Sequence, residues 1–157
     1  EYRRSCNHNT AWAMNQEQSQ MMGAFLWGKK ADTKLLKSDL TENQDSLLAE
    51  CVWQNGNKHS RSFCFNKADK LVIEDDMATT SDSYATLVLH PACQVKVENG
   101  KAVIQRGAIT VCIETNIEPT IEKCWYSEEY GKENETHKLC YPLNDNKLKT
   151  TIWIEKY

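Results

Sequence analysis

The feature that most constrains this fold is a succession of short apolar segments separated by turn signals. Segments rich in β-branched and aromatic residues predict strands near residues 47–54, 61–66, 70–79, 83–90, 93–98 and 108–114. Turn residues separate them at Asn55-Gly56-Asn57, Lys67-Ala68-Asp69, His90-Pro91 and Asn99-Gly100. We interpret residues 21–27 as a further strand, and the tail 147–157 can add an edge strand. Residues 31–46 fit either a long loop or one weak strand.

Two segments predict helices instead. Asn9 or Thr10 can cap a short helix that runs to about residue 20. The second helix is predicted over residues 117–131, since Pro119 suits a first helical turn and Gly131 follows the last one. Its apolar residues recur at helical spacing, at Ile117, Ile121, Cys124 and Trp125.

A helix, a meander of strands, a second helix and a tail are the order expected of an up-and-down barrel. We therefore expect one mainly-β domain over residues 1–157, an eight-stranded antiparallel barrel able to hold one small ligand. Residues 1–20 form its N-terminal segment and helix, 21–115 the barrel, 117–131 the C-terminal helix on the outside, and 132–157 the tail. The alternative is a sandwich, because Cys112, Trp125 and Cys140 could pass for immunoglobulin landmarks, but the predicted second helix argues against it.

The chain contains seven widely scattered cysteines and no Cys-x-x-Cys pair of the sort that zinc and redox sites use. We expect structural disulfides and a secreted, extracellular protein. An odd number leaves one thiol that is either free or paired with another molecule. Asn134-Glu135-Thr136 is a glycosylation sequon that agrees with secretion. A chain that opens at Glu1 without Met fits the product of signal-peptide removal.

Charge and hydropathy exclude two kinds of partner. Lys plus Arg total 19 and Asp plus Glu total 22, which gives a formal net charge of -3 with no long block of either sign. We therefore expect no nucleic-acid binding. Residues 84–89 are among the longest apolar stretches, far below the roughly 18 residues of a membrane span, so we expect no membrane insertion.

No catalytic constellation is evident, and we predict a protein that is not an enzyme and uses no metal or cofactor. The four histidines, at positions 8, 59, 90 and 137, are far apart in predicted turns or loops. Glu74-Asp75-Asp76 is the densest acidic cluster and is interpreted as a solvated rim, although one carboxylate could point inward. Neither a Gly-rich phosphate loop nor a nucleophile elbow occurs.

Three stretches resemble the tick salivary lipocalins, the family of histamine-binding and complement-inhibiting proteins. Asn9-Thr10-Ala11-Trp12, with apolar residues 22–27 after it, is similar to the family's opening. Ala92-Cys93-Gln94-Val95-Lys96-Val97 resembles the start of the penultimate barrel strand. Residues 117–124, with Tyr126, Tyr130 and Cys140 beyond them, resemble the C-terminal helix and closing cysteine.

The resemblance implies a disulfide pattern. Cys93 would pair with Cys124 and tie the barrel to the helix, and Cys51 would pair with Cys140. A third bridge from Cys6 to Cys112 is our conjecture, and it leaves Cys64 unpaired.

The resemblance also suggests a ligand. Gln94 and Thr110-Val111-Cys112 stand where amine-binding members carry acidic groups, and an unpaired buried amine is costly. A sterol, fatty acid or eicosanoid therefore fits better, as in the Japanin-like members that modulate host immune responses. The alternatives are a histamine or serotonin scavenger, and a module that binds a host immune-cell or complement protein. The predicted pocket residues are Phe25, Trp27, Trp53, Phe63, Phe65, Tyr84, Leu87 and Leu89.

Overall fold

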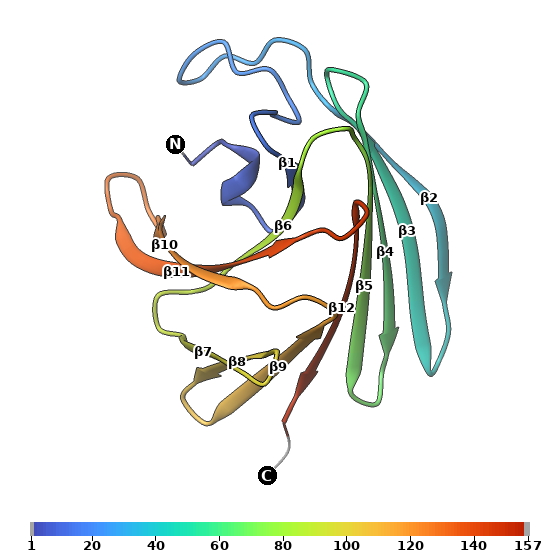
Figure 1. Cartoon of the computed structure of the whole chain (residues 1–157), viewed down its shortest axis with the longest axis vertical. Coiled ribbons are helices and arrows are strands. Elements are labelled where there is room, and N and C mark those ends of the chain that lie inside the picture. The colour runs from blue at the N-terminus through green and yellow to red at the C-terminus, as the bar shows by residue number, and fades with distance from the viewer. Residues whose placement is uncertain (1, 156–157) are drawn as a thin grey trace.

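Two antiparallel sheets face each other in the computed structural model, which describes residues 2–155 (Figure 1). The larger sheet has eight strands in the order β2-β3-β4-β5-β12-β9-β8-β7, and the smaller has four in the order β1-β6-β11-β10. A short 3-10 helix, η1 (Ser5–Asn7), precedes the strands. The strands are β1 (Ala11–Ala13), β2 (Asp32–Leu40), β3 (Gln44–Val52), β4 (Lys58–Asn66), β5 (Lys70–Ala78), β6 (Ser83–Val88), β7 (Gln94–Glu98), β8 (Lys101–Arg106), β9 (Ile109–Thr115), β10 (Thr120–Tyr126), β11 (Asn134–Pro142) and β12 (Lys147–Ile154).

The hydrophobic core lies between the two sheets, because successive side chains of a strand point to opposite faces. In β11, Leu139 and Tyr141 point into this core and are almost completely buried. They meet Ala102, Ile104 and Ile113 of the larger sheet. A second buried cluster lies beside it and is made of Ala11, Ala13, Trp53 and Met77.

Two tight hairpins show how the sequence sets the strand register. Asn99 and Gly100 both have positive φ, 52° and 77°, as the two-residue turn between β7 and β8 requires. Asp145 and Asn146 adopt the same left-handed backbone between β11 and β12, with φ of 48° and 61°. The Asn99-Gly100 turn prediction is confirmed.

The predicted barrel is wrong. Both sheets are open, with β2 and β7 at the edges of the larger one, and no α-helix occurs in residues 2–155. The observed architecture is the alternative, a sandwich of two sheets. The predicted second helix, which argued against a sandwich, is strand β10. Its apolar spacing misled because β10 is an edge strand with mostly exposed side chains, so it has no alternating burial.

Most strand predictions are close to the structure. β3, β4, β5, β6, β7 and β9 fall on predicted segments, and the ambiguous residues 31–46 contain β2 and the start of β3. β8 and β11 were missed, and residues 9–20 contain β1 instead of a helix. Residues 21–27 make only an isolated bridge, Met21 to Trp27. The tail prediction includes positions 156–157, which lie outside the described residues, and β12 is a central strand between β5 and β9.

Within residues 2–155, no helix is long and apolar enough to span a membrane.

Candidate functional site

A buried cluster of three polar side chains lies on the inner face of the larger sheet. His59 and Arg61 alternate on β4 and therefore share a face, and Asp75 pairs directly with Arg61 across the β4–β5 ladder. Asp75 Oδ1 lies 2.6 Å from His59 Nε2 and 2.6 Å from Arg61 Nε. Arg61 Nη2 donates to Asp75 Oδ2 at 3.1 Å, which completes a bidentate pair.

Electrostatics keep Asp75 ionised. Burial alone would raise the pKa of the Asp75 carboxyl, but hydrogen bonds from His59 and Arg61, together with the charge of Arg61, lower the pKa below its ordinary value. An ionised carboxylate can only accept hydrogen bonds, so Nε2 of His59 must carry the proton in this contact. The carboxylate thus fixes the orientation of the imidazole ring, as it does in acid–base sites.

The cluster also fastens the N-terminal segment to the sandwich. Arg61 Nη1 donates to the Asn9 carbonyl at 2.9 Å, and Asn9 Oδ1 accepts from the Val88 amide of β6 at 2.7 Å. Arg61 therefore connects β4, β5 and the chain that leads into β1. These contacts satisfy the cation, which makes Arg61 at least partly a structural residue.

A small pocket opens beside His59 and Arg61. Its volume is about 230 Å³, which is below the roughly 300–1,000 Å³ of ordinary ligand pockets. It is lined by Thr10, Gln18, Thr33, Ala49, Glu50, Cys51, His59, Arg61 and Phe63. The pocket can admit a small chemical group but not a sugar chain, so any larger substrate would need walls beyond this chain.

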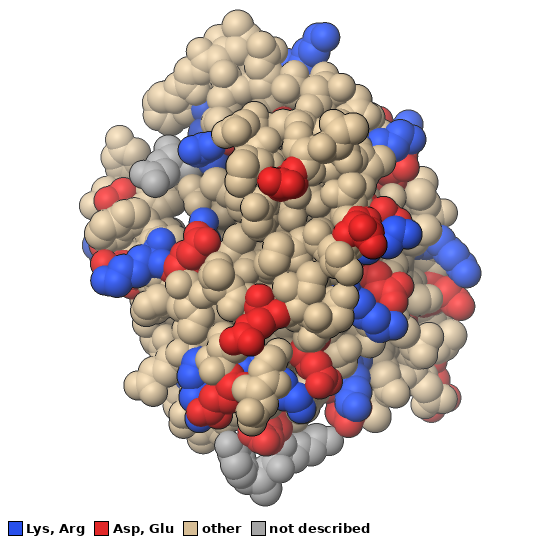
Figure 2. Space-filling view, in the orientation of Figure 1, with Lys and Arg blue, Asp and Glu red and all other residues tan. Residues whose placement is uncertain are grey.

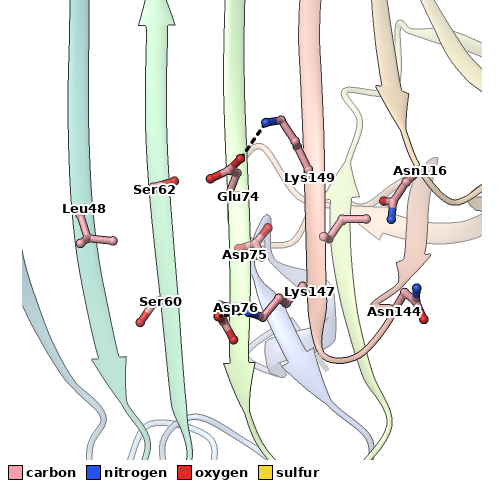
Figure 3. A pocket seen from close by; sticks show the side chains of 11 residues that line it. Leu48, Ser60, Ser62, Glu74, Asp75, Asp76, Asn116, Asn144, Lys147 and Lys149 are labelled. Atoms are coloured by element: carbon pink, nitrogen blue, oxygen red, sulfur yellow. Dashed lines mark ion pairs between the residues drawn. The ribbon is translucent and has the colours of Figure 1, made fainter.

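A larger hollow of about 480 Å³ lies on the opposite, outer face of the same sheet (Figure 3). Glu74 and Asp76 point to this face and pair with Lys149 at 2.9 Å and Lys147 at 3.2 Å. The hydrogen bond from Lys149 to Glu74 raises the pKa of the lysine. Both lysines are paired with carboxylates, and no histidine is among the residues that line this hollow.

The acidic run 74–76 thus divides between the two faces. Its outer carboxylates are solvated, as predicted, whereas Asp75 points inward. The inward carboxylate is already bonded to His59 and Arg61, so it is not available to hold an amine ligand.

The structure does not gather the eight predicted pocket residues around one cavity. Phe25 is 93% exposed, and Trp27 lies in the same segment, outside the strands of the two sheets. Trp53 is buried in the second core cluster. Tyr84 points outward from the smaller sheet and stacks on Trp12, with ring centroids 4.8 Å apart.

The other four predicted pocket residues belong to the sandwich interior or its margin. Phe63 and Phe65 alternate on β4, and Phe65 is 43% exposed. Leu87 and Leu89 pack against the main core. A sandwich interior filled by side chains leaves no barrel lumen for them to line.

All seven cysteines are free thiols in the structure. Cys112 points away from the core on the outer face of the larger sheet, whereas Cys6 lies against the outside of the smaller sheet near Lys138. A Cys6–Cys112 bridge would have to cross the sandwich, which disulfide geometry does not allow. Cys93–Cys124, Cys51–Cys140, the glycosylation of Asn134 at the exposed start of β11, and secretion stay predictions.

Sequence reasoning missed the cluster because His59 was placed in a loop. The signal was present: His59 and Arg61 at alternate positions of a strand imply two polar groups on one face, and Asp75 lies within the next strand. Charged residues on a buried face need partners, so a pairing between these strands could have been expected. Among residues 2–155, no group of three His, Cys, Asp or Glu side chains could hold a metal ion.

Fold and site together define an all-β sandwich domain whose inner face carries a buried His–Asp–Arg cluster beside a small pocket. The chain belongs to the heparinase II/III-like C-terminal family, whose model matches residues 1–155. No curated protein matches its sequence at a significant level.

Solved structures agree with this assignment. A heparan sulfate lyase from Pedobacter heparinus is similar over 99% of this chain, with a TM-score of 0.79 and 16% identity. A heparinase III gene product is similar over 99% of the chain, with a TM-score of 0.78 and 17% identity. The chain spans 25% of the length of each of these proteins. At such identities the likeness establishes the fold alone.

These findings correct the functional expectations. The chain is not a tick lipocalin, and the predicted carrier of a small hydrophobic ligand that modulates host immunity is wrong. The expectation of a protein that is not an enzyme is also wrong, because the family is that of the C-terminal part of heparinase-like enzymes. The alternative predictions, an amine scavenger and a module that binds a host immune protein, are wrong as well, because both depended on the lipocalin assignment.

Proposed function

We propose that this chain is the C-terminal β-sandwich of a polysaccharide lyase, and that its substrate is an acidic polysaccharide of the heparan sulfate type. The observation that carries this proposal is the family match over residues 1–155. The names of the similar structures, heparan sulfate lyase and heparinase III, support the substrate class.

The cluster offers a group suited to elimination. A lyase of acidic polysaccharides removes the proton from the carbon next to a uronate carboxylate, and the glycosidic oxygen leaves as a carbon–carbon double bond forms. Such a step needs a proton acceptor that is held in place. His59 is oriented by Asp75 through Nε2, which leaves Nδ1 as the second site on the ring.

The size of the inner pocket explains why this domain would not act alone. A volume of about 230 Å³ can admit one substituent of a sugar, such as a carboxylate, but not the chain on either side. The rest of the substrate site would come from the part of the lyase that has no counterpart in this chain. His59 and the small pocket would then form one wall of a shared cleft.

Substitution of His59 tests its role. His59→Gln keeps a side-chain N–H for Asp75 but removes the titratable ring. In the natural protein that contains this chain, we expect kcat on heparan sulfate to fall by about 100-fold or more, with a smaller change in KM. The measurement is the ultraviolet absorbance of the unsaturated product.

The matched control is His90→Gln, since His90 lies on the surface and contacts Glu128 at 3.2 Å. We expect this variant to keep the wild-type rate. Full activity in His59→Gln, with an unchanged circular dichroism spectrum, would show that His59 takes no part in the reaction.

A further inference from the structure

Residues 20–29 form an apolar hairpin that projects from the end of the sandwich. Main-chain bonds close it: the Gln20 amide donates to the Lys29 carbonyl at 2.8 Å, and the Gly28 amide donates to the Gln20 carbonyl at 2.9 Å. The Met22 amide donates to the Leu26 carbonyl at 3.0 Å nearer the tip. The apolar hairpin is therefore a formed element with its own backbone bonds.

Arg3 holds the tip from one side. Its Nη1 donates to the Gly23 carbonyl at 2.7 Å and also to the Ala24 carbonyl, while its guanidinium carbon lies 3.7 Å from the centroid of the Trp27 ring. These contacts fix the backbone of residues 23–27 and cover one face of the tryptophan. The tip side chains are left outside this arrangement.

The tip is strongly exposed for its composition. Phe25 is 93% exposed, Met22 61% and Leu26 58%. Single exposed apolar residues are ordinary, but several on one braced projection mark a surface that is covered by a partner. Ordering such a tip in advance lowers the entropy lost when it docks.

The hairpin segment 20–28 itself contains no charged residue. Charged residues flank this segment: Lys29 and Lys30 follow it, Arg3 contacts its backbone at Gly23, and Glu17 before it is paired with Arg4 at 3.2 Å. In Figure 2 the charged side chains are sparser over the upper part of this face than over the lower part, although a Lys or Arg side chain stands at the top edge. The exposed side chains at the tip, Met22, Phe25 and Leu26, are all apolar and therefore suit an apolar groove of a protein.

The position of the hairpin identifies the partner. The chain matches a C-terminal family and corresponds to 25% of the similar lyases, so the remainder of such a lyase would precede residue 1. The N-terminal residues lie at the same end as the hairpin (Figure 1), and Arg3 contacts it directly. We propose that the apolar hairpin docks into an apolar groove of the preceding part of the same lyase chain. This inference rests on the proposed function.

Site-specific cross-linking tests the docking. A photoreactive benzoyl-phenylalanine replaces Phe25 in the natural protein that contains this chain, and the cross-linked peptides are identified by mass spectrometry. The matched control places benzoyl-phenylalanine at Phe65, another exposed phenylalanine. Phe65 lies next to the C-terminal residue of β4, away from the hairpin. We expect cross-links from position 25 to peptides that precede residue 1, and loss of these cross-links when the probe is at position 65.

Three results would overturn the inference: cross-links between two copies, cross-links to lipid when vesicles containing phosphatidylserine are present, or reaction with water alone. The lyase activity of the unmodified protein separates the two proposals. An active lyase without the expected cross-links contradicts the docking only, whereas the expected cross-links in a protein without lyase activity contradict the proposed function only.

Discussion

At the scale of single residues, Asp75 is the group on which the site depends most. Its carboxylate is nearly inaccessible and neutralises Arg61 while orienting His59. Asp75→Asn leaves the mostly buried guanidinium without its charge partner, which we expect to cost about 3–5 kcal/mol in the free energy of unfolding. The matched control is the neighbouring Glu74→Gln, which breaks an exposed pair with Lys149 and should cost about 0–1 kcal/mol. Urea denaturation of both variants measures the difference, and equal costs would contradict the account of the cluster.

The same residue predicts a pH dependence. The folded pKa of Asp75 is lower than its ordinary value of 3.8, so the unfolded chain binds a proton first as the pH falls. The stability that Asp75 contributes is therefore complete well above pH 3.8 and is lost as the pH falls from there through the lower folded pKa. Wild type should lose more stability over this range than Asp75→Asn. Parallel acid titrations of the two proteins would contradict this prediction.

Substitution of Tyr141 should raise the free energy of unfolding, whereas the substitution of Asp75 should lower it. The hydroxyl of Tyr141 is buried in the core between the sheets and has no hydrogen-bond partner among residues 2–155, and burial raises the pKa of this hydroxyl far above its ordinary range. Tyr141→Phe keeps the ring and removes the unsatisfied group, so we expect a gain of about 1 kcal/mol in the free energy of unfolding. A loss of stability in denaturant titration would mean that the hydroxyl has a partner.

The thiols can be counted directly. Burial raises the pKa of Cys140 to about 11, so this thiol should react slowly with iodoacetamide in the native protein. In denaturant without reductant, seven labelled cysteines per chain are expected if all are free as in the structure. If Cys51, Cys93, Cys124 and Cys140 stay unlabelled instead, the result supports the two remaining disulfide predictions, Cys93–Cys124 and Cys51–Cys140.

At the scale of elements, β12 joins the two halves of the larger sheet, because it pairs with β5 on one side and β9 on the other. Thr150 is buried at a position paired on both sides, so Thr150→Pro should cost more than about 3 kcal/mol and prevent stable folding. Leu36→Pro is the control, since Leu36 lies at the bulge of edge strand β2. We expect its melting temperature to change little, and comparable losses in both variants would contradict the strand order.

The limits of prediction also appear at this scale. Alternating apolar residues and the Asn99-Gly100 turn were enough to predict most strands, because those signals are local. The order of the strands depends on long-range pairing, and nothing local in residues 147–154 distinguishes a central strand from an edge strand. The β10 segment combined helical spacing with edge exposure, so a local reading favoured the wrong element. His59 and Asp75 become a site only through the β4–β5 register.

At the scale of the whole molecule, the sandwich supplies a rigid inner wall with His59 and a braced apolar hairpin at the end where the chain begins. Under the proposed function, the quarter-length match to known lyases and a pocket too small for a sugar chain have the same explanation, a substrate site completed by a part of the lyase that has no counterpart in this chain. The fold alone does not establish the lyase function, since β-sandwiches serve many functions.

The central claim is that the protein cleaves an acidic polysaccharide by elimination. The most direct measurement is incubation of the natural protein that contains this chain with heparan sulfate, followed by mass spectrometry and ultraviolet absorbance of the fragments. The account predicts oligosaccharides with an unsaturated uronate at the new non-reducing end, each one water lighter than a hydrolysis product. Intact polymer, or saturated fragments that have gained water, would contradict it.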